Sequence, residues 1–338
     1  MATSRRRFVQ QSLATSGALA LLGPTCQQRQ EGEEGPKFEP VYLRLEREGE
    51  LRRREQELWR IFEACRCCPR GCGVNRLKGE TGFCSSSARL KVHGAGPHFG
   101  EERPLVGRGG SGTVFFSHCN LLCCFCQNWE INHRGDGEHL DHRALAGMML
   151  QLQSRGCHNI NLVTPTHVAP SIVRALRIGI GLGLHLPLVY NTGGYDSLEV
   201  VQLLDGIVDI YLPDFKYQDP VQAARYSSGA EDYPEVAAAV IKEMHRQVGT
   251  LKLSSTGIAQ RGLIVRHLVM PNNIAGTDRF VRWIAEELSP DTYVNIMAQY
   301  RPEHRASEYP EIARRITGDE WRQALAWAEA AGLRNLDT

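Results

Sequence analysis

Residues 112–126 read Gly112-Thr113-Val114-Phe115-Phe116-Ser117-His118-Cys119-Asn120-Leu121-Leu122-Cys123-Cys124-Phe125-Cys126. The apolar run 113–117 has the composition of a buried β-strand, and it leads directly into a loop with the spacing Cys-x3-Cys-x2-Cys. Thiolates at Cys119, Cys123 and Cys126 can each bind one iron of a 4Fe-4S cubane and leave the fourth iron open for a ligand. We therefore expect these three cysteines to hold such a cluster at the end of a strand.

A zinc site is the alternative for this loop. Zinc held by three cysteines needs a fourth ligand, and His118 stands beside the motif. Cys124 lies inside the motif, and spacing alone allows it to replace Cys123 or Cys126.

Beyond residue 112 the chain alternates short apolar runs with helical patterns. The apolar runs cover residues 113–117, 159–163, 188–191, 208–212, 262–270 and 293–297. The helical patterns cover residues 143–155, 170–179, 198–204, 234–248, 278–288 and 318–331. Alternating strands and helices predict parallel pairing with right-handed crossovers. We expect an α/β fold over residues 101–338, a partial (β/α)6 barrel that is open at one side and ends in a C-terminal helix.

The motif and its position resemble those of the radical S-adenosylmethionine (SAM) superfamily. The resemblance runs from about residue 65 to the C-terminus and is nearest to a branch related to pyruvate formate-lyase activating enzyme. It implies that the three spaced cysteines hold a 4Fe-4S cluster and that Cys124 is a packed thiol. It further implies that SAM binds the open iron, with Phe125 near the adenine. An electron from an external reductant then cleaves SAM to a 5′-deoxyadenosyl radical, which abstracts hydrogen from a substrate.

Polar residues near the ends of the predicted strands are the candidate cofactor contacts, because the site of such a barrel lies at its C-terminal strand ends. In the run 159–163, Asn159 and Asn161 alternate with apolar residues and are expected to face the barrel interior. The activating enzymes carry a Gly-Gly-Glu motif after this strand, which contacts the amino group of the cofactor. This chain has Thr164-Pro165-Thr166 there, so Thr164 or Thr166 is expected to replace that contact.

Three further strand ends carry candidates. Asn191 stands in a Tyr-Asn-Thr-Gly-Gly stretch that resembles the Thr-Asn-Gly turn of the activating enzymes, although a simple tight turn explains it too. Asp214 and Lys216 resemble the family's Asp-x-Lys pair, with an exposed salt bridge as the alternative. Arg266 interrupts an apolar run and needs a partner, either the cofactor carboxylate or Asp214. The sequence assigns no catalytic residue.

Cysteine use also marks the region before the barrel. Nine of the eleven cysteines lie between residues 65 and 126, which suits metal ligation better than a disulfide framework. We name residues 65–100 the Cys-rich segment and expect it to lack regular elements. Its four spaced cysteines predict a second metal site, either zinc or an auxiliary iron–sulfur cluster, with disulfides as the alternative. These cysteines are Cys65, Cys68, Cys72 and Cys84, and Cys67 is spare.

The first 26 residues are expected to be a signal. Ser4-Arg5-Arg6-Arg7-Phe8 resembles a twin-arginine export signal, and a short apolar stretch follows over residues 13–22. This predicts export to the periplasm or the outer face of the membrane, with cleavage near Cys26. The alternative is a basic N-terminus on a cytoplasmic protein. Residues 27–64 are expected to form a linker and then a surface helix over residues 43–62.

The composition of the chain limits the classes of partner and substrate that we expect. Lys plus Arg (39) nearly balances Asp plus Glu (38), so no basic field indicates nucleic acid, and no apolar run is long enough to predict a membrane span. A protein or peptide substrate is the first expectation, because relatives in the resembled group install glycyl radicals in partner enzymes. A small-molecule substrate is the second. An iron–sulfur protein for electron transfer or redox sensing, without radical chemistry, is the alternative of another class.

Overall fold

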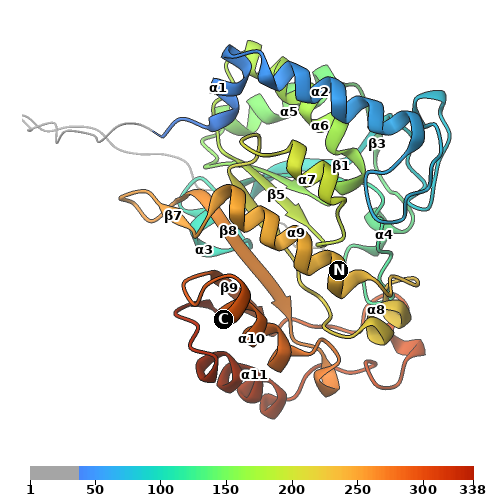
Figure 1. Cartoon of the computed structure of the whole chain (residues 1–338), viewed down its shortest axis with the longest axis vertical. Helices are drawn as coiled ribbons and strands as arrows, with labels where there is room; N and C mark the ends of the chain where they lie inside the picture. Colours follow the sequence, from blue (N-terminus) through green and yellow to red (C-terminus); the bar gives the residue numbers. More distant parts are fainter. Residues whose placement is uncertain (1–37) are drawn as a thin grey trace, which may run out of the picture. The chain divides into compact units, whose positions relative to one another are not determined.

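In this computed structural model, which describes residues 38–338, seven parallel strands follow one another in chain order across one large sheet (Figure 1). They are β2 (Ser111–Phe116), β4 (Ile160–Val163), β5 (Leu188–Thr192), β6 (Ile210–Pro213), β8 (Ala259–Leu268), β9 (Tyr293–Met297) and β10 (Asn335–Asp337). Three further strands pair in antiparallel fashion. β1 (Leu90–His98) lies beside β2 and β3 (Glu138–Leu140) beside β1 at one edge, whereas β7 (Lys252–Leu253) pairs with the beginning of β8, off the main strand order. The predicted signal, Cys26 and the linker up to residue 37 lie outside the described residues.

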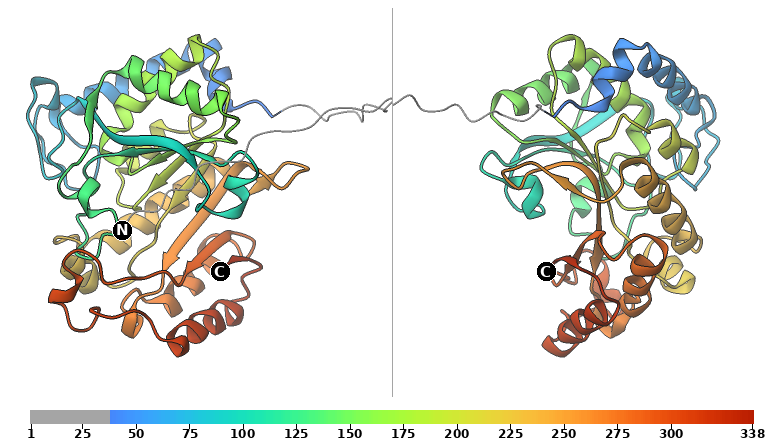
Figure 2. Two further views of the ribbon diagram at one scale, coloured as in Figure 1. Left: turned by 180° about the vertical axis from the view of Figure 1, so that it is seen from behind. Right: turned by 60° about the vertical axis from the view of Figure 1, so that its left-hand side comes forward.

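The longer helices are arranged around the outside of the sheet (Figure 2). The helices are α1 (Val41–Arg47), α2 (Glu50–Arg60), α3 (Arg103–Val106), α4 (Trp129–Asn132), α5 (His142–Ser154), α6 (Ala169–Gly181), α7 (Leu198–Leu203), α8 (Pro220–Tyr226), α9 (Tyr233–Val248), α10 (Thr277–Glu287) and α11 (Gly318–Ala330). Short polar side chains fix several starts. The side chain of Asp141 caps α5, and Thr317 and Glu320 form a capping box at α11.

Alternating side chains on the strands separate the two faces of the sheet. Ile160 and Leu162 of β4 are buried in the main core, with side chains of α5 and α6. On the opposite face, Asn159 accepts a hydrogen bond from Ser111 Oγ (2.7 Å) and donates to the carbonyl of Leu105 in α3 (2.9 Å). Asn159 therefore lies on the face of the sheet opposite α5 and α6, as the alternation predicts.

The prediction of an α/β fold with parallel strands is confirmed. β9 has the predicted bounds, and α11 ends one residue before its predicted end. Every predicted strand and helix beyond residue 112 is present, with ends shifted by a few residues. Within the described part of the chain, no helix combines the length and the apolar character needed to cross a membrane.

Two predictions for the region before residue 112 are wrong. Residues 43–62 are not one helix, because Gly49 takes a φ of 77° between α1 and α2 and a left-handed residue cannot continue a right-handed helix. The Cys-rich segment is not wholly irregular, since β1 occupies its last third. β2 and β3 both pair with β1, and this pairing orders a stretch that contains two glycines and a proline.

Candidate cofactor site

A cavity of about 260 Å³ lies where six neighbouring parallel strands end at the same edge of the sheet. The loop after β2 supplies one wall, and the C-terminal ends of β4, β5, β6, β8 and β9 supply the others. The side chains that line it include Cys119, Cys123, Phe125, Cys126, Thr164, Asn191, Thr192, Asp214, Lys216, Arg266, Met297 and Gln299. Parallel strands bring these residues together because all their carboxyl ends point the same way.

The three spaced cysteines lie on the cluster loop, which we define as residues 119–126. The Sγ of Cys123 lies 3.0 Å from Ser227 Oγ, and Asn132 Nδ2 donates to Cys126 Sγ at 3.2 Å. Burial raises the pKa of all three thiols, that of Cys126 to about 12, while the positive charge of Lys216 acts against burial at Cys119 and Cys123. The three thiols are therefore held in a setting where a proton or a metal is favoured over a bare thiolate.

The placement of these thiols meets one requirement of a 4Fe-4S cluster. Among residues 38–338, no group of three or more His, Cys, Asp or Glu side chains is placed to hold one metal ion. In a cubane each thiolate binds a different iron, so the thiols need to line one cavity rather than meet at one point. Cys119, Cys123 and Cys126 all line the same cavity.

The two residues that could have changed the ligand set do not face this cavity. Cys124 is buried outside its lining, with its backbone N–H donating to Tyr226 (2.9 Å) and its carbonyl accepting from Arg305 (2.8 Å). His118 has a φ of 74°, and its ring packs against Gly135. Burial lowers the pKa of His118. Neither side chain is positioned as a further ligand.

Asp214 is at the centre of the charged wall. Lys216 Nζ lies 2.5 Å from its Oδ2, and Arg266 Nε lies 2.9 Å from its Oδ1. Arg266 also donates to Asn191 Oδ1 at 2.6 Å. Burial opposes ionisation, yet Arg266 and Lys216 lower the pKa of Asp214. The ion pair faces the cavity rather than bulk solvent, because the three side chains are only 15–20% exposed.

Not every predicted contact reaches the cavity. Thr164 lines it with a φ of 59°, and this left-handed turn directs the following chain away. Thr166 instead donates to the buried carboxylate of Asp196 (2.7 Å) behind the cavity wall. Asn161 is fully buried and is not among the residues that line the cavity, and neither atom of its amide has a hydrogen-bond partner among the described residues.

Residues that the sequence did not single out line an adjoining groove of about 750 Å³. It shares the lining residues Arg266, Met297 and Gln299 with the cavity, so the two spaces lie side by side. Glu101 and Glu102 lie 3.8 and 3.9 Å from the Arg266 guanidinium. Burial, with the neighbouring carboxylates, raises the pKa of Glu101 to about 7. Both glutamates follow β1, which was not predicted, so no strand-end signal could mark them.

No protein-family model matches the chain. Among curated proteins, "Uncharacterized protein MJ0674" of Methanocaldococcus jannaschii is 34% identical over 285 residues, which cover 81% of this chain and 76% of that protein. The chain belongs to the family of this archaeal protein. Among solved structures, "TYW1 with a lysine-pyruvate adduct bound" aligns with a TM-score of 0.40 and 8% identity over 64% of this chain and 73% of that one. A likeness at that level carries no argument about chemistry.

In this member of the family, the Cys-rich segment is built around a buried arginine. Arg76 Nη1 lies 3.9 Å from Cys65 Sγ and 3.7 Å from Cys67 Sγ, and it donates to the carbonyl of His167 at 2.5 Å. A hydrogen bond from Cys67, with the charge of Arg76, lowers the pKa of Cys65 to about 5. The structure therefore groups Cys65 with Cys67, which spacing left spare.

The other three cysteines of the predicted second metal site are Cys68, Cys72 and Cys84. Cys68 and Cys84 are buried, and burial raises the pKa of both. Both are also near enough to Cys65 for its charge to raise their pKa. Cys72 is half-buried, and its Sγ accepts from the backbone N–H of Phe83 at 3.3 Å.

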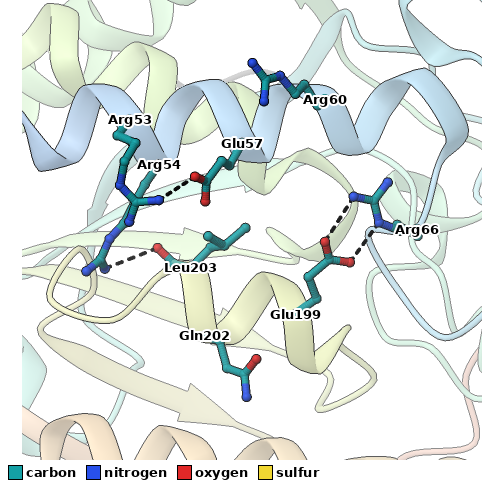
Figure 3. A pocket seen from close by; sticks show the side chains of 8 residues that line it. All are labelled: Arg53, Arg54, Glu57, Arg60, Arg66, Glu199, Gln202 and Leu203. Atoms are coloured by element: carbon teal, nitrogen blue, oxygen red, sulfur yellow. Dashed lines mark hydrogen bonds and ion pairs between the residues drawn. The ribbon is translucent and has the colours of Figure 1, made fainter.

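A separate pocket of about 480 Å³ lies between α2 and α7 (Figure 3). It holds two ion pairs, Arg66 with Glu199 at 2.8 Å and Arg53 with Glu57, and its four arginines outnumber its two glutamates. None of the cysteines is among its lining residues. We therefore place the candidate site in the cavity beside the cluster loop.

Proposed function

We propose that the protein is a radical SAM iron–sulfur enzyme built on a partial (β/α)6 barrel. The observation that supports this most strongly is the position of Cys119, Cys123 and Cys126, which line one cavity together with polar side chains from five other strand ends. The chain order of the parallel strands also suits a partial barrel. The donor set fits a site-differentiated cluster, because three thiols line the cavity and Cys124 does not.

When bound, a reduced cluster and SAM supply a 5′-deoxyadenosyl radical for hydrogen abstraction. The residues of the chain hold and orient the reactants. Arg266 and Lys216 offer cationic donors to a carboxylate, and Asn191 and Thr164 offer polar groups to the rest of the cofactor. Phe125, which packs between the rings of Tyr217 and Tyr300, offers an apolar contact for the adenine.

The adjoining groove suits the substrate. Its volume of about 750 Å³ exceeds that of the cavity, and it opens beside Arg266, Met297 and Gln299. A segment of a protein or peptide fits such an extended site, and the reaction that we place first is installation of a radical in that partner. The same groove also accommodates a small-molecule substrate, and an activity assay with both substrate classes would distinguish them.

The deciding experiment is anaerobic reconstitution with iron and sulfide, reduction with dithionite, addition of SAM, and measurement of 5′-deoxyadenosine. We expect the wild-type protein to form it and Cys126→Ala not to, with Cys124→Ala as the matched control that retains activity. A cluster that forms without any 5′-deoxyadenosine would instead support an electron-transfer or redox-sensing protein. Failure of the wild-type protein to take up any iron would overturn both functions.

We also propose that residues 1–26 direct the folded protein through the twin-arginine route. Replacing Arg5 and Arg6 together by lysine should retain full-length protein in the cytoplasm, because a receptor recognises the arginine pair. Fractionation that finds the unchanged protein full-length in the cytoplasm would contradict export.

A further inference from the structure

The cluster loop is held from two sides. On one side is the chain that follows α8, where Ser227 Oγ contacts Cys123 Sγ at 3.0 Å and Ser228 Oγ donates to the carbonyl of Leu122 at 3.0 Å. The other side is formed by the Cys-rich segment. It contacts the loop in space, although the contacting residues, Arg70 and Asn120, are 50 positions apart in the chain. In Figure 1 the Cys-rich segment forms the blue loops on the side of the molecule where α4 and α8 lie.

Arg70 of the Cys-rich segment bridges both supports. Its Nε donates to the carbonyl of Asn120 at 3.2 Å, and its Nη2 donates to the carbonyl of Ser227 at 3.1 Å. Its guanidinium carbon lies 4.0 Å from the centre of the Phe83 ring and 5.3 Å from that of Tyr195. One planar group therefore joins the residue after the first cluster cysteine to the residue that contacts the second.

We propose that Arg70 is a positioning residue that clamps the cluster loop, so that the Cys-rich segment holds Cys119 and Cys123 in place for the cluster. This inference rests on the proposed function. The rigid guanidinium fork can donate to two carbonyls at once, and stacking on Phe83 and Tyr195 fixes its plane. A lysine at the same position carries the charge but has no fork with which to hold both carbonyls.

A second connection leads from the same segment to the start of the loop. Arg76 donates to the carbonyl of His167, and His167 Nε2 lies 2.8 Å from the carbonyl of Ser117, two residues before Cys119. Asn120 is itself fixed, since its Nδ2 donates to the carbonyl of Tyr195 at 2.6 Å. The segment thus contacts the loop directly at Asn120, and through His167 it is connected to Ser117, just before the loop.

The test compares Arg70→Ala and Arg70→Lys with the control Arg66→Ala. Arg66 lies in the same segment but pairs with Glu199 on the surface, where both side chains are 48% exposed. Each full-length variant is reconstituted anaerobically. Iron and sulfide per chain, the electron paramagnetic resonance spectrum of the reduced cluster with and without SAM, its midpoint potential and its rate of loss in air are then measured.

We expect Arg70→Ala to lose the cluster in air about tenfold faster, the factor that corresponds to one charged hydrogen bond. Its spectrum should broaden, and its midpoint potential should fall because a positive charge that favours the reduced cluster is gone. Arg70→Lys should keep most of the potential and still lose the cluster faster, and Arg66→Ala should match the wild type.

Cluster properties decide between a clamp and a role in stability alone. An Arg70→Ala protein that melts at a lower temperature but keeps the wild-type spectrum, potential and cluster lifetime would overturn the clamp. If Arg70→Ala does not fold, Arg70→Lys with wild-type cluster lifetime would overturn it equally. Failure of the wild type to bind a cluster would reject the proposed function instead.

Discussion

The two groups of cysteines are similar in spacing and differ in what surrounds them. Cys119, Cys123 and Cys126 face a cavity with room for a ligand that comes from outside the chain. Cys65 and Cys67 face Arg76, a cation that belongs to the chain and is almost fully buried. Spacing therefore predicts that thiols can bind a metal, whereas the surrounding side chains determine whether a cofactor has a place to enter.

The largest expected effect is at the cluster loop. Cys126→Ala should abolish the cluster and its visible absorption. Among the described residues only Cys119 and Cys123 would still present thiols to the cavity, and no further cysteine lines it to replace Cys126. Cys124→Ala is the matched control and should keep the full iron content. The opposite pattern, with iron lost only in Cys124→Ala, would show that the ligand assignment is wrong.

Next in size is the loss of the buried arginine in the Cys-rich segment. Arg76→Met should lower the free energy of unfolding by about 3 kcal/mol, because it removes hydrogen bonds from a charged group to buried carbonyls. These bonds go to His167 (2.5 Å) and Ser87 (2.7 Å). Urea unfolding measures the change, with Arg66→Ala as a control expected to cost less than about 1 kcal/mol. If Arg76→Met and Arg66→Ala lowered the free energy of unfolding equally, Arg76 would not be the special support of the Cys65–Cys67 group that the comparison assumes.

A smaller effect is expected from the cysteines of the predicted second metal site. The described side chains do not form a metal-ion group at these cysteines, so this substitution tests the predicted second metal site directly. If the site binds a metal, Cys72→Ser should remove one metal equivalent and lower the melting temperature, because metal binding is coupled to folding. Cys67→Ser should keep the metal if Cys67 is spare. Metal analysis and native mass spectrometry measure both. Retention of metal in Cys72→Ser with loss in Cys67→Ser would move the site towards Arg76, and disulfides without metal would reject it.

The smallest effect concerns Glu101, which lines the groove next to the cavity of the cluster loop. Its pKa in the folded protein is about 7, above the ordinary value of 4.5 that applies in the unfolded chain. Between pH 4.5 and 7 the unfolded chain has therefore lost this proton while the folded protein still holds it. Folding therefore loses stability over that range, and the full cost remains above pH 7. Glu101→Gln should gain about 1–2 kcal/mol relative to the wild type at pH 8 and almost nothing at pH 4.5.

Thermal unfolding of the protein without SAM at both pH values measures this difference. Glu287→Gln, at a side chain that is 47% exposed, is the control and should show no such dependence. A gain for Glu101→Gln that is the same at both pH values would mean that Glu101 is not the group that titrates.

Sequence patterns predicted the parallel sheet well because each strand and helix carries its own local signal. The apolar run at residues 293–297 became β9 with unchanged bounds. β1 was missed because Gly94, Gly96 and Pro97 obscure its pattern, and its order comes from pairing with β2. Gly49 did carry a signal for the break between α1 and α2, which the expected single helix overlooked.

Site residues were predictable where they directly follow a strand. Asp214 and Lys216 lie at the cavity as their position after β6 suggests, whereas Thr166 lies behind the wall because Thr164 turns the chain after β4. Arg70 carried no signal at all. Its partners, Asn120 and Ser227, are distant in sequence, and only folding brings their carbonyls to one guanidinium.

The chain order of the parallel strands also bears on how the protein is made. Synthesis produces the cluster loop first, and Met297 and Gln299, which also line the cavity, much later. Until β9 joins the sheet, a cluster on the loop would stand open to water and oxygen. We expect cofactor loading to follow the folding of β9, so that any export of the loaded protein carries a finished domain rather than an extended chain.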